Sequence, residues 1–176
     1  MKVIKAEDVS TEAQVENPTP NADPVRLAEA QEKFDQFRQM LETKNYDIAL
    51  TADQTTALFD VFYSKVAWKG YESYAIAETF DKLNALVVDH TLVGKTSVEI
   101  VEAIFHFLKN HIGTGVEEAK AHKQLCDQFA IPMKEINEDR QELRDRSLEV
   151  VAAEQGITVE NLVEEYQKAQ ALQGQR

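Results

Sequence analysis

Hydrophobic residues between positions 24 and 131 recur at alternating spacings of three and four, which is the period of an amphipathic α-helix. The first stripe consists of Leu27, Ala30, Phe34, Phe37 and Leu41. Pro24 is favoured at a first helical position, and Asp23 before it can cap the free amides. The pattern therefore predicts a helix from Pro24 with a narrow apolar seam that suits a second helix.

Four further stripes follow, and three of their helices are expected to begin at a capping box, in which a threonine precedes Gln or Glu by three residues. The boxes are Thr51 with Gln54, Thr96 with Glu99, and Thr114 with Glu117. The stripes consist of Leu58, Phe59, Phe62 and Val66; Ile76, Phe80, Leu83 and Val87; Val98, Val101, Ile104, Phe105, Phe107, Leu108 and Ile112; and Val116, Ala119, Cys126 and Phe129. The breaks are expected near Gly70, at Gly113 and before Pro132, because glycine ends helices and proline does not continue them.

Two segments interrupt this helical pattern. Residues 45–50 are expected to be extended over a few positions, and residues 89–95, with the sequence DHTLVGK, are predicted to form a loop. The end of that loop, VGKTS, resembles a phosphate-binding loop, but position 89 is Asp where the motif requires glycine. We therefore interpret Thr96 as a helix cap and not as part of a nucleotide site.

The last third of the chain is more polar. A helix is predicted from Met133, but residues 137–147 contain only one apolar side chain, Leu143. We expect this stretch to cross solvent, stabilised by pairs such as Glu142 with Arg146. An apolar face returns and ends at Gly156, after which Thr158 is predicted to cap a final helix whose apolar side carries Val159, Leu162 and Tyr166.

These elements predict an all-α chain of six to seven helices. Residues 1–23, rich in proline and poor in apolar side chains, are expected to form a flexible arm. Alternatively, Val3 and Ile4 could anchor this arm on another chain. Residues 24–131 are predicted to form a bundle-like domain, and residues 132–176 an extended helical hairpin.

The charge, the cysteine count and the lack of long apolar runs disfavour several classes of function. The 176 residues include 31 Asp and Glu against 19 Lys and Arg, so the formal net charge of −12 disfavours direct nucleic-acid binding. The single cysteine, Cys126, excludes an internal disulfide, no apolar run approaches the roughly 20 residues that span a bilayer, and the first residues do not resemble a signal peptide. We expect a cytoplasmic location, or incorporation into a larger assembly such as a virion.

Aromatic residues concentrate between positions 59 and 74, a stretch that contains the only tryptophan. The spacing favours two helices that pack across Gly70, with the polar tips of the rings at the surface. The alternative is a protein-binding patch formed by Trp68, Tyr71 and Tyr74, because interfaces favour these residue types.

Two sets of metal-ligating residue types occur at helical spacing. Glu118, His122 and Cys126 follow one another at intervals of four residues. Glu99, Glu102 and His106 lie on the predicted helix that starts after residue 96, but the di-metal bundle motif requires Glu and His three residues apart. We interpret His106, His122 and Cys126 as structural residues, and we predict no metal and no other cofactor.

The main hypothesis is therefore a non-catalytic accessory or assembly protein that binds other protein chains or its own copies. Small helical proteins of bacteriophages have a similar general composition. The candidate contact residues are Trp68, Tyr71, Tyr74, Leu27, Phe34, Arg140 and Arg144. Two alternatives remain open: a metal-dependent helical enzyme, and an acidic mimic that blocks a basic nucleic-acid-binding surface.

Overall fold

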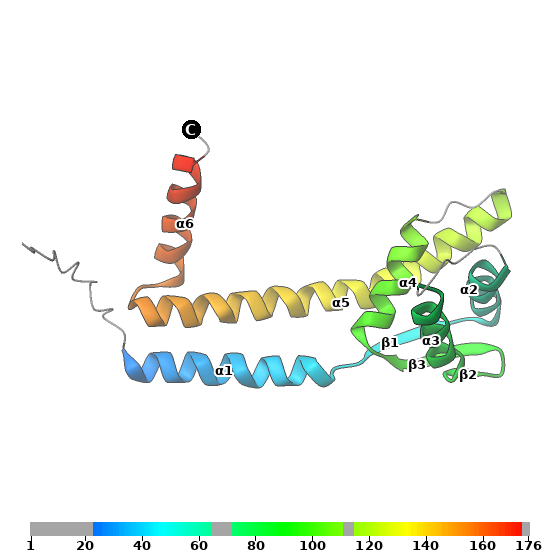
Figure 1. Cartoon of the computed structure of the whole chain (residues 1–176), viewed down its shortest axis with the longest axis horizontal. Helices are drawn as coiled ribbons and strands as arrows, with labels where there is room; N and C mark the ends of the chain where they lie inside the picture. Colours follow the sequence, from blue (N-terminus) through cyan, green and yellow to red (C-terminus); the bar gives the residue numbers. More distant parts are fainter. Residues whose placement is uncertain (1–22, 65–71, 111–114, 174–176) are drawn as a thin grey trace, which may run out of the picture. The chain divides into compact units, whose positions relative to one another are not determined.

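A computed structural model describes residues 23–64, 72–110 and 115–173 (Figure 1). Most of these residues lie in six helices, so the prediction of a mainly helical chain is confirmed. All but the last residue of the N-terminal arm predicted over positions 1–23 lies outside the described residues. In chain order the elements are α1 (Pro24–Thr43), β1 (Tyr46–Leu50), α2 (Ala52–Ser64), α3 (Glu72–Asn84), β2 (Val87–Val88), β3 (Thr91–Thr96), α4 (Val98–Asn110), α5 (Val116–Gln155) and α6 (Val159–Gln173).

The first two predicted caps are present. Asp23 Oδ1 accepts a hydrogen bond from the backbone N–H of Val25 at 3.0 Å, which starts α1. At the start of α2, the Thr51 hydroxyl accepts from the N–H of Gln54 at 3.3 Å, and the Gln54 side chain accepts from the N–H of Thr51 at 3.0 Å. This reciprocal pair satisfies two backbone donors that the helix itself leaves unpaired.

The cap predicted at Thr96 is wrong by one residue. Thr96 is the last residue of β3 and is buried, whereas the Ser97 carbonyl accepts the first helical bond of α4, from the N–H of Val101 at 3.2 Å. The cap predicted at Thr114 lies outside the described residues.

A three-stranded antiparallel sheet replaces the predicted loop at residues 89–95. The strand order is β1-β3-β2, and β1 pairs with β3 from Tyr46 opposite Thr96 to Leu50 opposite Leu92. β2 and β3 are joined by a two-residue turn in which Asp89 and His90 have φ values of 49° and 65°. Two successive positive φ values define the type I′ turn, whose twist matches that of the strands.

The contacts divide the chain into two compact units. One unit spans residues 32–147 and has a continuous core of side chains from β1, β3 and α2 to α5. Its largest fully buried side chains include Leu58, Phe80, Leu92, Ile104 and Phe129. The other unit comprises residues 1–31 and 148–176, and among its described residues Ala152, Ala153 and Leu162 are buried.

α5 does not end before Pro132, in contrast to the prediction; it continues as one helix of 40 residues. A proline inside a helix costs about 3 kcal/mol because it removes one backbone donor and crowds the preceding turn. Here Pro132 is itself buried, in a row with Leu125, Phe129 and Ile136. The burial of this row offsets the cost of the proline. Consequently, the predicted boundary between residues 131 and 132 falls within a continuous helix.

Val116, Ala119, Cys126 and Phe129 were predicted to face inward at the start of α5, and this prediction is wrong for the first two. Val116 is 73 % exposed and Ala119 is exposed, whereas Cys126 is half-buried and Phe129 is buried. The buried row begins further along the helix, at Leu125.

Candidate functional site

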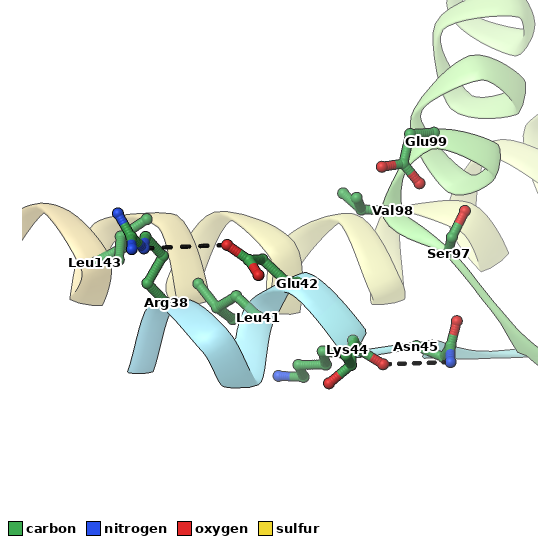
Figure 2. Close-up of a pocket in the computed structure, with 10 residues that line it drawn as sticks. Arg38, Leu41, Glu42, Lys44, Asn45, Ser97, Val98, Glu99 and Leu143 are labelled. Atoms are coloured by element: carbon green, nitrogen blue, oxygen red, sulfur yellow. Dashed lines mark hydrogen bonds and ion pairs between the residues drawn. The ribbon is translucent and has the colours of Figure 1, made fainter. Parts of the chain in front are cut away.

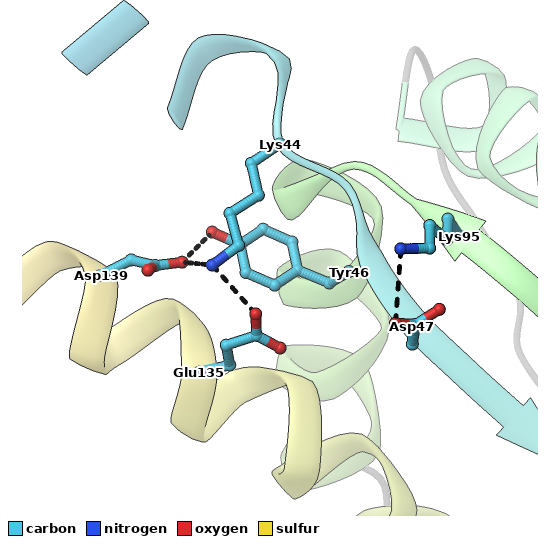
Figure 3. Close-up of polar contacts among 6 residues, drawn as sticks. All are labelled: Lys44, Tyr46, Asp47, Lys95, Glu135 and Asp139. Carbon is cyan, nitrogen blue, oxygen red and sulfur yellow. Dashed lines mark hydrogen bonds and ion pairs between the residues drawn. The ribbon is translucent and has the colours of Figure 1, made fainter. Parts of the chain in front are cut away.

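A partly buried polar cluster connects the start of β1 to α5 (Figure 3). The Lys44 ammonium donates hydrogen bonds to Asp139 Oδ2 at 2.6 Å and to Glu135 Oε1 at 2.9 Å. The Tyr46 hydroxyl donates to the same oxygen of Asp139 at 2.8 Å. The ammonium also lies 5.1 Å from the centre of the Tyr46 ring. It therefore interacts with two carboxylates and one aromatic face.

The environment of this cluster keeps both proton donors protonated. Burial alone would lower the pKa of Lys44, but the hydrogen bonds and charges of Asp139 and Glu135 outweigh burial and raise this pKa. Burial, followed by the hydrogen bond to Asp139, raises the pKa of Tyr46 to about 12. At neutral pH the Lys44 ammonium and the Tyr46 hydroxyl therefore both stay protonated, and their hydrogen bonds connect the start of β1 to α5.

An open pocket of about 470 Å³ adjoins the cluster (Figure 2). Leu41, Val98 and Leu143 provide its apolar lining. Its charged groups interact with near neighbours: Arg38 forms an ion pair with Glu42 at 4.0 Å. Hydrogen bonds from Ser97 and from its own backbone lower the pKa of Glu99. The pocket thus lacks a concentrated charge of either sign.

The two arginines predicted as partner contacts differ in their surroundings. Arg140 donates two hydrogen bonds to Glu102 of α4, at 2.5 and 2.9 Å, so this bidentate pair joins α4 to α5. Arg144 is exposed. The structure therefore gives Arg140 a partner within the chain.

The polar segment at residues 137–147 was expected to be surrounded by solvent, but one side of it packs against α1. The predicted ion pair is confirmed, with Arg146 Nη2 at 2.6 Å from Glu142 Oε1. The same guanidinium lies over the buried ring of Phe37 on α1, at 4.5 Å from its centroid. A cation stacked on an aromatic face explains why a polar segment can pack here.

The seam on α1 is used for packing within the chain. Phe37 is buried, while Leu27 and Phe34 are half-buried. Arg38 lies 5.9 Å from the centre of the Phe34 ring. Leu27 and Phe34 are thus half-covered within the chain, and their role as contact residues stays a prediction.

The aromatic stretch is described only in part. Phe59 and Phe80 meet edge to face, with ring centroids 5.5 Å apart, so α2 and α3 share a core. Tyr74 is 79 % exposed and does not belong to that core. Trp68 and Tyr71 lie outside the described residues, so the predicted patch of three aromatic residues stays a prediction.

His106, His122 and Cys126 contact other groups of the same chain. The His122 Nε2 donates to the backbone carbonyl of Leu108, and Cys126 Sγ lies 3.7 Å from the same nitrogen. His106 Nε2 accepts from the Asn110 side chain at 3.0 Å. Burial, followed by the charge of Asp127, raises the pKa of Cys126, which disfavours the thiolate. Among the described residues, no three His, Cys, Asp or Glu side chains are placed to share a metal ion.

A groove runs between α4 and α5, lined by four apolar residues and seven polar or charged ones. Two adjoining cavities, of about 540 and 460 Å³, share the half-buried side chains of Phe105 and Met133 and the exposed Lys109. The Lys109 ammonium lies 5.0 Å from the centre of the Phe105 ring. We call this feature, defined by Phe105, Lys109, Ala130 and Met133, the α4–α5 groove.

The helix α6 leaves an apolar stripe uncovered. Its start is anchored, because the Thr158 hydroxyl accepts from the N–H of Asn161 at 3.3 Å and Leu162 is buried. From Val163 to Ala171, however, every side chain is exposed. Val163, Tyr166 and Ala169 lie within a 120° sector of the helix, and we call these three residues the α6 stripe. Tyr166 is 55 % exposed.

No protein-family model, curated protein or solved structure matches this chain. In the described part of the chain, none of the helices has the length and apolar character needed to cross a membrane.

Sequence reasoning proposed neither the α6 stripe nor the α4–α5 groove as a contact surface. The predicted apolar side of α6 was Val159, Leu162 and Tyr166, of which Leu162 is buried, Val159 is half-buried and Tyr166 is exposed. Only Tyr166 belongs to the α6 stripe, and spacing alone does not tell whether a stripe is covered. The groove was missed because it arises where α4 and α5 meet, and neither helix contains a local signal for it. The exposed lysine beside Phe105, four residues along the same helix, is the one feature that could have drawn attention to it.

Proposed function

We propose that this protein is a non-catalytic interaction protein that binds other protein chains, or copies of itself, through the α6 stripe. The observation that carries the proposal is the run of exposed side chains from Val163 to Ala171 on a helix with an apolar side. Helices of this length are marginal in water by themselves, and helices in proteins are stabilised chiefly by burying an apolar face. A partner chain would supply that burial.

The polar chemistry of the chain supports the same proposal. Lys44, Glu135, Asp139 and Tyr46 are engaged with one another, which gives them a structural role. By contrast, the α6 stripe includes a tyrosine, and tyrosines with an exposed ring often dominate the binding energy of an interface.

The test compares two exposed tyrosines. Light scattering over a range of concentrations, together with co-purification from the native source, would be carried out for the wild-type chain and for Tyr166→Ala and Tyr74→Ala. We expect the wild-type chain to form an assembly or retain a stable partner, and Tyr166→Ala to weaken that association at least tenfold. Tyr74→Ala serves as the matched control and should leave it unchanged.

Two outcomes would count against the proposal. A wild-type chain that stays monomeric at every concentration and retains no partner would contradict it. Loss of association in Tyr74→Ala alone would instead assign binding to the aromatic stretch at residues 59–74.

A further inference from the structure

Buried side chains are distributed unequally between the two compact units of the chain. In the unit at residues 32–147, which we call the core unit, fourteen buried side chains form one continuous core. We call residues 23–31 and 148–173, the described part of the other unit, the α6 unit. Its buried side chains are two alanines and Leu162. Because hydrophobic stabilisation grows with the apolar surface removed from water, packing stabilises the α6 unit much less than the core unit.

The polar contacts of the α6 unit do not compensate for its small core. The Thr158 hydroxyl accepts from the N–H of Asn161, which stabilises the first turn of α6. Lys168 lies 3.5 Å from Glu164 of the same helix, and both side chains are more than 60 % exposed. Exposed pairs of this kind add little to stability. In the core unit, by contrast, the partly buried cluster around Lys44 joins β1 to α5.

Like charges also destabilise the α6 unit. It contains seven Asp and Glu residues against two Arg and Lys residues, which gives a net charge of −5. An excess of one sign destabilises a compact state through self-repulsion. The unit is also shorter than the roughly 40 residues below which a fold usually needs disulfides, metals or association.

The helix α5 belongs to both units. It is one helix of 40 residues, and the division between the units falls between Ser147 and Leu148. Leu125, Phe129 and Ile136 bury its first part in the core unit. Helices in water depend on the burial of an apolar face, so the two parts of α5 are stabilised to different extents.

We propose that the α6 unit opens and closes by local unfolding while the core unit stays folded. The inference goes beyond the proposed function, because it concerns the free chain without a partner. Proteins open in cooperative units of widely different stability, and segments that bind ligands are drawn from the least stable ones. A chain that binds the α6 stripe would stabilise the closed form, so its binding would be coupled to the folding of this unit.

Amide hydrogen exchange on the full wild-type chain, followed by mass spectrometry of peptides, is the direct test. The decisive comparison lies within α5, between residues 125–136 and residues 148–155. We expect residues 148–155, and α6 with them, to exchange at least about a hundredfold faster than residues 125–136. Equal protection along the whole of α5 would overturn the proposal.

Three variants assign the opening to the α6 unit. Leu162→Ala removes the one large side chain buried there and should accelerate exchange at residues 148–171 at least about tenfold. Gln167→Ala, at an exposed position of the same helix, is the control and should change exchange by less than about twofold. Ile104→Val removes one methylene from the core unit and should accelerate exchange in α4 while leaving residues 148–171 unchanged.

The remaining outcomes separate this inference from the proposed function. Faster exchange at residues 148–171 in Ile104→Val would show that the two units unfold together, and an unchanged rate in Leu162→Ala would show that burial of Leu162 does not close the unit. Either result would overturn the proposal and leave binding at the α6 stripe standing. A chain that retains no partner, yet shows the expected exchange pattern, would contradict the proposed function alone.

Discussion

At the scale of single residues, Lys44 combines low exposure with ion pairs to two carboxylates. Its ammonium forms short contacts with two carboxylates of α5, and its side chain is only 24 % exposed. Removal of one partner from a largely buried ion pair leaves uncompensated charge, which costs more than the pair contributes when it is intact. The cluster is therefore expected to be sensitive to substitution.

Replacing Lys44 with methionine should lower the free energy of unfolding by roughly 2–3 kcal/mol, because the largely buried Asp139 loses its cation. The matched control is Lys95→Met. Lys95 also forms an ion pair with an aspartate, Asp47 at 3.6 Å, but both side chains are more than 60 % exposed. We expect the control to change stability by less than about 0.5 kcal/mol. Urea unfolding would measure both, and equal effects would contradict the structural role of the cluster.

Tyr46 should make stability dependent on alkaline pH. Its pKa is raised in the fold from 10.0 to about 12, so its contribution is complete below pH 10. Between pH 10 and 12 the unfolded chain releases the proton while the folded chain retains it, and roughly 2 kcal/mol of stability is lost. Lys44, whose pKa is also raised, adds to the loss in the same direction.

The variant Tyr46→Phe isolates the tyrosine. We expect it to be less stable at pH 7 by about 1 kcal/mol, because a hydrogen bond to a carboxylate is lost. From pH 10 to 12, however, its stability should fall less than that of the wild-type chain. Parallel alkaline losses in the two proteins, measured by urea unfolding at each pH, would show that Tyr46 does not carry this dependence.

At the scale of elements, the end of α5 depends on Gly156. The N–H of Ile157 donates to the carbonyl of Ala152 at 3.0 Å, the N–H of Gly156 donates to that of Ala153 at 3.2 Å, and Gly156 has a φ of 68°. These are the two bonds of a Schellman motif, in which a left-handed residue closes the helix. The sequence predicted this end correctly, because few residues other than glycine adopt that conformation readily.

Gly156→Ala should destabilise the last turn of α5 and the start of α6 by about 1 kcal/mol, because a Cβ is strained at this φ. Gly115→Ala is the control: a Cβ there meets no atom within 4 Å, and the expected change is within about 0.5 kcal/mol. Amide hydrogen exchange at residues 148–162 would detect the local effect. Unchanged protection in Gly156→Ala would contradict it.

The β2–β3 turn can be improved. Asp89 and His90 both adopt positive φ values, which Asn-Gly adopts more readily than any other pair in this turn type. We expect the double substitution Asp89→Asn with His90→Gly to raise the free energy of unfolding by about 1 kcal/mol. Alanine at both positions should lower it instead. If both double variants shift the urea midpoint in the same direction, the assigned turn is wrong.

The same turn explains why the sheet was not predicted. Asp-His is not a typical hairpin pair, and the two valines of β2 are too few to show an alternating pattern. Local sequence signals predicted helix ends correctly where one or two residues set the geometry, as in the reciprocal hydrogen bonds of Thr51 and Gln54. They failed at Pro132, because the burial of a neighbouring row overcomes the usual effect of an internal proline.

At the scale of the whole molecule, the chain combines a cored unit at residues 32–147 with a smaller unit that contains α6. Helical spacing predicted most of the helices, and on α6 it placed Tyr166 on the apolar side together with Val159 and Leu162. Whether that side is covered depends on contacts between distant segments, and no local pattern encodes them. The same holds for the α4–α5 groove, which exists only because Phe105 and Met133 come together from different helices.

The central claim is that the α6 stripe contacts another protein chain. A photo-crosslinking amino acid placed at position 166 of the full chain, and separately at position 171 on the opposite side of α6, tests this claim most directly. Upon illumination, position 166 should yield a discrete adduct with another chain, and position 171 should yield little or none. The absence of any adduct at position 166, or equal adducts at the two positions, would contradict the account.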